Sequence, residues 1–445
     1  MTLLEIASLF NITHAKDVAL SGICIDSRKI RPGNLFVAIQ GERFDGHEFI
    51  HDAVAQGAAA IVCSQVRADV AIPQLVVSDT LNALATIAAY HRRQLDCAVV
   101  ALTGSNGKTT VKDMIASILP KPAFATPGNL NNHIGAPMSV LQLQPEHRYA
   151  VFELGANHRG DIAHTVKVVQ PQVTLINNIA PAHIEGFGSI DGVALAKGEI
   201  HEGLAAGGTA VINDDDAYAN FWDSLLTNKK IVRFSAKHPA TIHAHNVTLN
   251  ADGCAQFTLV LPEGAAQIQL AVPGAHNVSN ALAAAACTHA LGISLPAIAA
   301  GLSRFSGVAG RMTCLPGKNN ALIIDDTYNA NLRSVLTALD VLAARKGQRI
   351  FVFGDMGELG AWSEQHHQEV GVAARNHGID SLMTCGKYSE LTTQAFGAGG
   401  QHFPDQETLA QVLLKKLDSH TTVLVKGSRS SAMENIVRQL LVPSL

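Results

Sequence analysis

The stretch VVALTGSNGKTT, residues 99–110, joins an apolar run to a glycine-rich turn and then to a helical pattern. Glycines allow backbone N–H groups to converge on an anion, and the following helix N-terminus adds the positive end of its dipole. Lys108 would reach the outer phosphates of a nucleotide, and the Thr109 hydroxyl a bound Mg²⁺. Leu102 stands where the usual phosphate-loop pattern has its first glycine, so we interpret the segment as a shorter variant of that loop rather than an ordinary capped turn. The nucleotide-binding residues expected here are Gly104, Ser105, Asn106, Gly107, Lys108, Thr109 and Thr110.

Apolar strand-like segments alternate with helical patterns along the 445 residues. This alternation favours a mostly parallel sheet covered by helices, so we expect an α/β fold. Domains of about 150 residues predict three for this length. We place a small α/β domain at residues 1–80, a central parallel-sheet domain with the phosphate loop at 81–308, and a Rossmann-like α/β domain at 309–445. Alternating residues near 240–272 predict a small antiparallel appendage.

The segments expected to be regular can be placed by residue. The strands are 35–39, 58–64, 74–79, 98–103, 149–154, 173–179, 208–214, 321–326, 349–355, 381–386 and 421–427. The helices include 47–58, 81–94, 275–291 and 295–304.

Composition narrows the class of protein. Hydrophobic residues make up 47% of the chain and charged residues 16%, which supplies enough apolar material for packed cores. The formal net charge of −4 gives no support for a nucleic-acid-binding surface. The seven cysteines stand singly, which fits a reducing compartment and offers no zinc site. No apolar run is long enough to span a membrane, and the first residues lack a cleavage signal, so we expect a cytoplasmic protein.

TGSNGKTT resembles the phosphate loop of the Mur ligase family, ATP-dependent enzymes that extend the peptide of the peptidoglycan precursor. Further segments similar to that family follow in order over nearly the whole chain: DSRKIRPGNLFVAIQGERFDGHEFIHDAVAQGA (26–58), PGNLNNHIGAP (127–137), FELGANHRGDI (152–162), NIAPAHIEGFGS (178–189), LAKGEI (195–200), GAHNVSNALAAAA (274–286), GR (310–311), DDTYNAN (325–331), GDMGELG (354–360) and VKGSRS (425–430). GNLNN, DDTYNAN and GDMGELG together are most like the branch that adds D-alanyl-D-alanine. Many members carry proline after NAN, where this chain has Leu332.

The resemblance implies a bacterial ligase that joins D-alanyl-D-alanine (D-Ala-D-Ala) to UDP-N-acetylmuramoyl-tripeptide (UDP-MurNAc-tripeptide) through an acyl phosphate, releasing ADP and phosphate. The N-terminal domain would hold the UDP-sugar, the central domain ATP, and the C-terminal domain the incoming dipeptide. ATP and two Mg²⁺ ions are the implied cofactors, and the two peptide substrates are the implied partners. We expect a monomer that binds no nucleic acid.

The resemblance also assigns residues to the metal ions: Thr109, Glu153, His183 and Lys197. The matching lysine of the family is carbamylated by CO₂, which would turn Lys197 into an anion that supports the second ion. Local context alone favours a solvated surface lysine there, since lysine is rarely buried. Glu153 could likewise be a strand-end carboxylate facing solvent.

Three further residues are implied to reach ATP. Asn277 would contact the adenine, while Arg311 and Asp326 would reach the phosphates and the ribose once the C-terminal domain closes. Asn277 could instead cap a helix, and Arg311 and Asp326 could form a linker salt bridge. The implied catalytic residues are Lys108, Lys197 and Arg311.

The remaining implied contacts are to the substrates. Ser27, Arg28, Asp45 and His47 would contact the uridine and sugar, and Asn131 and Asn132 the growing peptide. Asn329 and Asn331 would contact the dipeptide, and Lys426 and Arg429 a peptide carboxylate. Paired asparagines are also ordinary turn formers, so both interpretations stay open.

Three other functions compete. DDTYNAN argues against a Mur ligase that adds a diamino acid, and the N-terminal segment argues against a folylpolyglutamate synthase. A non-catalytic ATP-binding relative would not need the whole set of candidate catalytic residues. FGDMGELG (353–360) lacks the G-x-G-x-x-G spacing, which excludes a dinucleotide fingerprint.

Overall fold

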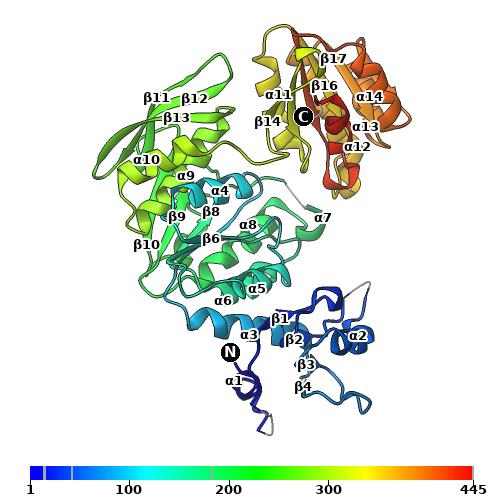
Figure 1. Ribbon diagram of the computed structural model, residues 1–445. Coiled ribbons are helices and arrows are strands. Elements are labelled where there is room, and N and C mark those ends of the chain that lie inside the picture. Colours follow the sequence, from blue (N-terminus) through cyan, green and yellow to red (C-terminus); the bar gives the residue numbers. More distant parts are fainter. Residues whose placement is uncertain (14–16, 42–43, 182–183, 443–445) are drawn as a thin grey trace.

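The computed structural model describes residues 1–13, 17–41, 44–181 and 184–442. Within these residues the strands form three sheets, of four, nine and six strands, in chain order. We call the sheets with their helices the N-terminal, central and C-terminal modules. Figure 1 shows them as three lobes, with the N-terminal module in blue and the C-terminal module in yellow to red, both lying against the central module. No helix of the described part combines the length and apolarity needed to cross a membrane.

The N-terminal module is a parallel sheet in the order β1-β2-β3-β4. Its two middle strands are buried throughout. Helix α3 begins where the Asp79 carboxylate accepts hydrogen bonds from the N–H groups of Leu81 and Asn82, and it leads the chain into the central module. The elements are α1 (Leu3–Ser8), β1 (Gly22–Cys24), β2 (Asn34–Val37), α2 (Ile50–Ala55), β3 (Ala60–Cys63), β4 (Gln74–Val76) and α3 (Thr80–Arg93).

The central sheet has the order β13-β12-β11-β10-β9-β8-β5-β7-β6. Strand β5 lies between β7 and β8, parallel to both, so the strand order reverses direction beside the phosphate loop. Open α/β sheets bind ligands at such a switch point, outside the carboxyl ends of the strands. The elements are β5 (Ala98–Thr103), α4 (Lys108–Ile118), β6 (Ala123–Ala125), α5 (Gly135–Val140), β7 (Tyr149–Glu153), α6 (Asp161–Val169), β8 (Val173–Ile176), α7 (Ile184–Phe187), α8 (Ile190–Gly198), β9 (Thr209–Asn213), β10 (Lys230–Ser235), β11 (Ile242–Leu249), β12 (Cys254–Leu261), β13 (Gly264–Pro273), α9 (His276–Ala290) and α10 (Leu295–Arg304).

The predicted antiparallel segment is confirmed, but it is not a separate appendage. β11, β12 and β13 pair antiparallel, and β11 also pairs parallel with β10, at Phe234 with Ile242 and Ser235 with His243. The segment therefore extends the central sheet. Alanine-rich α9 packs into the same core, since small side chains let a helix approach the sheet closely.

The C-terminal sheet has the order β14-β15-β19-β16-β17-β18, with only β14 antiparallel among these pairs. The carboxyl ends of β15, β19 and β16 meet at one edge, which brings the segments after Asp326, Lys426 and Phe353 together. The α/β class predicted for the chain is confirmed. The elements are β14 (Thr313–Pro316), β15 (Leu322–Asp326), α11 (Leu332–Ala343), β16 (Gln348–Phe353), α12 (Ser363–Asn376), β17 (Ser381–Cys385), α13 (Ser389–Phe396), β18 (Gly400–Phe403), α14 (Gln406–Leu414), β19 (Thr421–Lys426) and α15 (Glu434–Leu440).

Candidate active site

The predicted phosphate loop connects β5 to α4. Gly107 precedes the helix with a φ of +78°, in the left-handed region that glycine adopts without strain. A Cβ at this position would lie 2.6 Å from Oδ1 of Asn280 and 2.7 Å from Nδ2 of Asn177. Glycine is therefore required here both for its backbone conformation and for the close approach of two asparagines.

A second loop supports the phosphate loop from beneath: residues 177–180, which follow β8, here called the support loop. The side chain of Asn178 accepts from the backbone N–H of Asn106 at 2.9 Å and donates to its carbonyl oxygen at 3.0 Å. The Ser105 hydroxyl donates to the carbonyl of Ala180 at 2.9 Å. Sequence reasoning missed the role of Asn177 and Asn178, although two asparagines directly after a buried strand were a usable signal.

Lys108 begins α4, and its Nζ donates to the Gly104 carbonyl at 2.9 Å. Burial lowers the pKa of Lys108, the Glu153 carboxylate raises it, and the positive charge of Arg311 lowers it again. The ammonium group therefore sits over the loop that it is expected to complete around a nucleotide.

Glu153 ends β7 and is 3% exposed. Its two carboxylate oxygens accept hydrogen bonds at 2.8 Å, one from the Thr109 hydroxyl and one from the Asn131 amide. The interpretation of Glu153 as a solvent-facing residue is thus wrong. A carboxylate and a hydroxyl are oxygen ligands of the kind Mg²⁺ takes beside phosphates and waters, so these residues fit that ion.

The rest of the predicted metal set is only partly described. His183 lies outside the described residues. Within the described part of the chain, no three His, Cys, Asp or Glu side chains are grouped closely enough to hold a metal ion.

Lys197 lies on α8 and is 2% exposed, so the surface interpretation is wrong. Burial, and then the positive charge of Lys108, lower the pKa of Lys197 to about 7. Its Nζ lies 5.9 Å from the centre of the Phe187 ring. The side chain lines the same cavity as Lys108 and Glu153.

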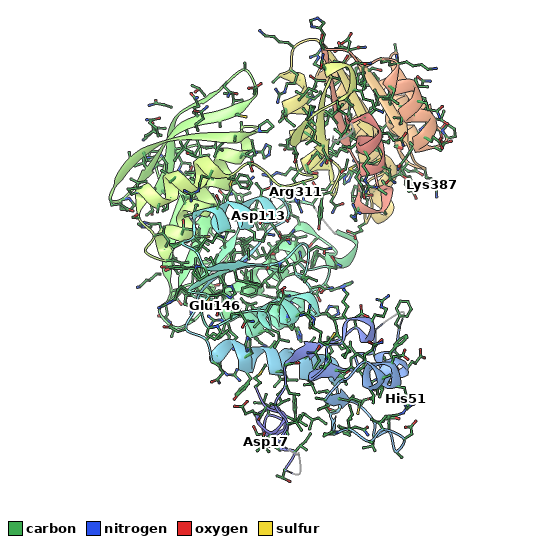
Figure 2. All side chains as sticks on the ribbon, viewed as in Figure 1. Asp17, His51, Asp113, Glu146, Arg311 and Lys387 are labelled. Atoms are coloured by element: carbon green, nitrogen blue, oxygen red, sulfur yellow. The ribbon has the colours of Figure 1, made fainter. Side chains whose placement is uncertain are left out.

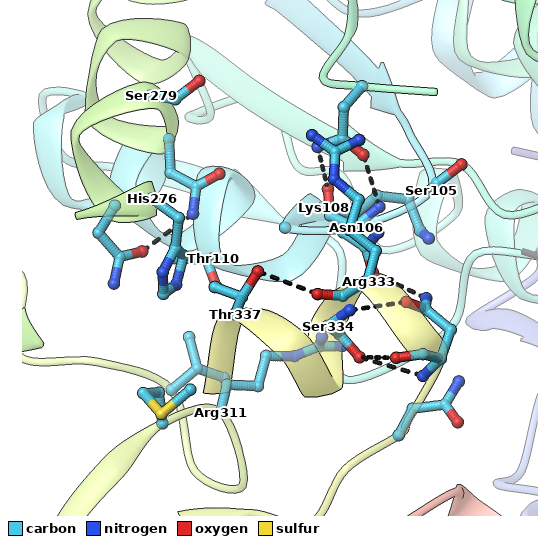
Figure 3. A pocket seen from close by; sticks show the side chains of 18 of the residues that line it. Ser105, Asn106, Lys108, Thr110, His276, Ser279, Arg311, Arg333, Ser334 and Thr337 are labelled. Carbon is cyan, nitrogen blue, oxygen red and sulfur yellow. Dashed lines mark hydrogen bonds between the residues drawn. The ribbon is translucent and has the colours of Figure 1, made fainter. Parts of the chain in front are cut away.

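The C-terminal module reaches this loop directly. Nη2 of Arg311 donates to the Thr109 hydroxyl at 2.8 Å, and its guanidinium lies 4.1 Å from the centre of the Tyr328 ring. The Asn331 amide donates to Oδ1 of Asn106 at 2.8 Å while its own oxygen caps α11. Figure 2 places Arg311 at the junction of the two modules, and Figure 3 shows α11 facing the phosphate loop.

Buried Lys426 forms an ion pair with half-buried Asp326 at 2.5 Å and also donates to the Asn329 carbonyl at 3.0 Å. Arg429 lies apart from them on the surface, paired with Glu434 at 2.8 Å. The structure therefore does not bring Lys426 and Arg429 together as one anion site. It also places Asp326 in a pair with Lys426 rather than in a linker salt bridge with Arg311.

Asn277 is 3% exposed on the first turn of α9. Its amide donates to the Pro273 carbonyl at 2.8 Å, and its oxygen accepts from the Asn280 amide at 2.9 Å. Because α9 has no side-chain cap, the capping interpretation of Asn277 is wrong. The side chain instead borders the cavity that Lys108 and Glu153 also line.

These groups line one cavity of about 540 Å³ between the central and C-terminal modules. The predicted residues that line it are Ser105, Asn106, Gly107, Lys108, Thr110, Asn131, Glu153, Lys197, Asn277, Arg311, Asp326, Asn329, Asn331 and Lys426. A cavity of this size suits a small-molecule substrate. Loops from both modules shape it, so its geometry depends on their relative position.

Comparison with known proteins bears on what occupies the cavity. Models of the Mur ligase family catalytic domain, the Mur ligase middle domain and the Mur ligase glutamate ligase domain match residues 19–92, 102–288 and 310–429. The UDP-N-acetylmuramoyl-tripeptide–D-alanyl-D-alanine ligase of Escherichia coli K12 is 46% identical over 99% of this chain and 98% of its own length. The chain belongs to the Mur ligase family.

Solved Mur ligases have the same fold. A crystal structure of MurF from Acinetobacter baumannii is 36% identical, with a TM-score of 0.91 over 99% of this chain and 98% of that one. MurF ligase from Thermotoga maritima, solved in complex with ADP, is 26% identical, with a TM-score of 0.84 over 96% of this chain and 98% of that one. The resemblance inferred from the motifs is therefore confirmed along the whole chain.

The substrate residues predicted in the N-terminal module of this Mur ligase lie away from the cavity. Asp45 and His47 pair at 2.6 Å, and the other ring nitrogen of His47 accepts from the Ser64 N–H at 2.9 Å. Nearby, Ser27 is buried and Arg28 is exposed. His47 is thus held by both of its ring nitrogens.

Two asparagines predicted to contact the growing peptide differ in their surroundings. Asn131 binds Glu153, as described above, and lines the cavity. The Asn132 oxygen accepts from the N–H of Gly135 at 2.7 Å, so this residue shapes the turn before α5. The turn-former interpretation therefore describes Asn132 but not Asn131.

Proposed function

We propose that the chain is an ATP-dependent ligase that joins D-Ala-D-Ala to UDP-MurNAc-tripeptide, forming the UDP-MurNAc-pentapeptide of peptidoglycan synthesis. The observation that carries the proposal is the 46% identity to a ligase of that name, which extends over 99% of this chain. The cavity between the phosphate loop and the C-terminal module supports it, because such a ligase must bring a phosphoryl donor and two peptides together.

The three modules divide this work. We assign the UDP-sugar to residues 1–80, ATP to 81–308 and the incoming dipeptide to 309–445. Arg311 contacts the phosphate loop from the C-terminal side, which supports a reaction centre at the junction of the last two domains. The protein acts as a monomer in the bacterial cytoplasm, where ATP and the nucleotide-linked precursor are available.

The first chemical step makes the tripeptide carboxylate reactive. One of its oxygens attacks the γ-phosphorus of ATP, ADP leaves, and an acyl phosphate results. Lys108 and Arg311 balance the charge that develops on the transferred phosphoryl group. Their ammonium and guanidinium groups approach the loop from different modules, so both cations are in place only when the modules are docked.

Mg²⁺ supplies Lewis-acid stabilisation of phosphoryl oxygens when it is bound. Thr109 and Glu153 would hold one ion, and Lys197 with His183 would support a second. Carbamylation of Lys197 requires a neutral amine, and a pKa of about 7 leaves much of the amine neutral near neutral pH, whereas an ordinary lysine is almost wholly protonated there. The burial of this amine therefore favours its reaction with CO₂.

The second step forms the amide. The free amine of D-Ala-D-Ala attacks the acyl carbon, the tetrahedral intermediate collapses, and inorganic phosphate leaves with the oxygen that came from the carboxylate. Docking of the modules excludes water that would hydrolyse the acyl phosphate. Asn329 and Asn331, at the carboxyl end of β15, are the residues we assign to the dipeptide.

The test is ADP release with Mg²⁺ and a matched panel of substrates. UDP-MurNAc-tripeptide with D-Ala-D-Ala should release ADP and give the pentapeptide by mass spectrometry, while omission of the dipeptide should abolish product. Release with UDP-MurNAc-dipeptide and a diamino acid would instead indicate the diamino-acid-adding activity. ATP binding without release in any combination would indicate a non-catalytic relative.

A further inference from the structure

Arg333 makes a contact between the central and C-terminal modules, and none of the functions described above involves it. Arg333 lies on the first turn of α11, and its Nη1 donates to the carbonyl oxygen of Ile179 at 3.1 Å. Ile179 is in the support loop, so the contact joins the C-terminal module to the loop beneath the phosphate loop. Arg333 also lines the cavity, as Figure 3 shows.

A contact at Ile179 can affect the phosphate loop because hydrogen bonds hold the support loop against it. The N–H of Ile179 is held by the Asp216 carboxylate at 2.9 Å. Its two neighbours, Asn178 and Ala180, bind the backbone of Asn106 and the hydroxyl of Ser105. Arg333 therefore binds a rigid segment one residue away from both contacts to the phosphate loop.

The position of Arg333 is otherwise unfavourable for a cation. The N-terminus of a helix carries partial positive charge, so an arginine in the first turn is repelled by the helix dipole. Asn331 already caps this end of α11, so the helix does not need Arg333 to begin. The side chain gains instead from a charge-assisted hydrogen bond to a carbonyl of the other module.

We propose that Arg333 is a positioning residue for the ligation, and this rests on the proposed function. By holding the Ile179 carbonyl, it keeps the C-terminal module where Arg311 meets Thr109 and the dipeptide site faces the phosphate loop. Its loss weakens the docked arrangement, while the nucleotide contacts within the central module remain.

Arg345 provides a matched control. It follows the other end of α11, and its Nη2 donates to the Asp252 carbonyl of the central module at 2.7 Å. Arg345 is absent from the residues that line the cavity in the described structure. Arg333→Met and Arg345→Met thus each remove a guanidinium–carbonyl contact between the same two modules, and Arg345→Met also removes a 3.9 Å ion pair with the Asp252 carboxylate. Only the first variant acts at the support loop.

The experiment compares these variants and Arg333→Lys with the wild type. Arg333→Met should lower kcat for ADP release roughly three- to tenfold, with the Kd for ATP measured without peptides changed less than about twofold. Arg333→Lys should recover part of kcat, and Arg345→Met should stay within about twofold of wild type. Equal losses in the two methionine variants, or no loss in Arg333→Met, would overturn the proposal.

Amide hydrogen exchange with bound ADP and Mg²⁺ gives a second readout that does not depend on the substrates. Arg333→Met should accelerate exchange in residues 104–110 and 177–180, and Arg345→Met should not. Unchanged exchange at both loops would also overturn the proposal. If the wild type released no ADP with these substrates, the proposed function would fail, while the exchange comparison would still decide the role of Arg333.

Discussion

Replacing Lys197 should separate the stability of this protein from its activity. Folding lowers the pKa of Lys197 from 10.5 to about 7. At pH values below about 7, where the buried amine must also carry a proton, this lowers the free energy of unfolding by on the order of 5 kcal/mol. Lys197→Met keeps the buried aliphatic chain and removes the amine. The variant should therefore unfold at a higher urea concentration than the wild type, and its free energy of unfolding should be a few kcal/mol larger.

The pH dependence follows from the direction of the pKa change. Between pH 7 and 10.5 the unfolded wild type binds more protons than the folded one, so wild-type stability rises with pH in that range. The advantage of Lys197→Met in CO₂-free buffer should thus be largest at and below about pH 7 and shrink toward pH 9. Lys112→Met is the control, because that buried ammonium is paired with Asp113 at 3.2 Å and bonded to the Thr126 carbonyl at 3.0 Å, so its removal should destabilise the protein.

Activity should change in the opposite direction. Lys197→Met should lose at least about 100-fold in ADP release, as expected when a group that stabilises transition-state charge is removed, and should still bind ATP. Because a carbamate is a carboxylate-like anion, acetate or formate should restore part of the activity in Lys197→Ala. Near-normal turnover of either variant without CO₂ or small acids would refute the carbamate, and unchanged stability would refute the burial argument.

Three further predictions concern Gly107, Asp326 and His201. Gly107→Ala, which places a Cβ 2.6 Å from a neighbouring side chain, should abolish ATP binding by calorimetry, whereas Gly128→Ala, with no atom within 4 Å, should retain it; equal affinities would contradict the packing argument. Asp326→Asn leaves the Lys426 charge buried and unpaired, so urea unfolding should show a loss of about 3–5 kcal/mol, and a loss under about 1 kcal/mol would indicate that solvent reaches the pair. Burial lowers the His201 pKa to about 4, so stability should fall by up to ~3 kcal/mol as pH drops from 6.5 to 4; His201→Gln should flatten this dependence, and an unchanged slope would assign it to other groups.

Local signals predicted the reaction centre better than they predicted its surroundings. The bounds of β5 follow from AVVALT (98–103) and the start of α4 from TGSNGKTT, because a buried strand and a glycine turn are both local patterns. β10 and β14 were missed, since both strands are only partly buried and β14 has only four residues. Without β10, the sequence could not show that the antiparallel segment joins the central sheet.

Side-chain burial and contacts between modules depend on tertiary packing, which explains the remaining errors. Lys197 was open to a surface interpretation, although its setting, VALAKG, lacks the polar neighbours of an exposed helix face. Lys426 and Arg429 are three residues apart, yet one is buried against Asp326 and the other lies on the surface. Arg333 had no motif at all, because its partner is a backbone carbonyl about 150 residues away.

We propose that the tripeptide carboxylate is activated as an acyl phosphate at the junction of the central and C-terminal modules. The most direct measurement is oxygen transfer from UDP-MurNAc-tripeptide labelled with ¹⁸O in its terminal carboxylate. During ligation to D-Ala-D-Ala, each inorganic phosphate released should carry one labelled oxygen. Pentapeptide formation with unlabelled phosphate would contradict an acyl-phosphate mechanism, because the phosphoryl group would then never have been bonded to the carboxylate.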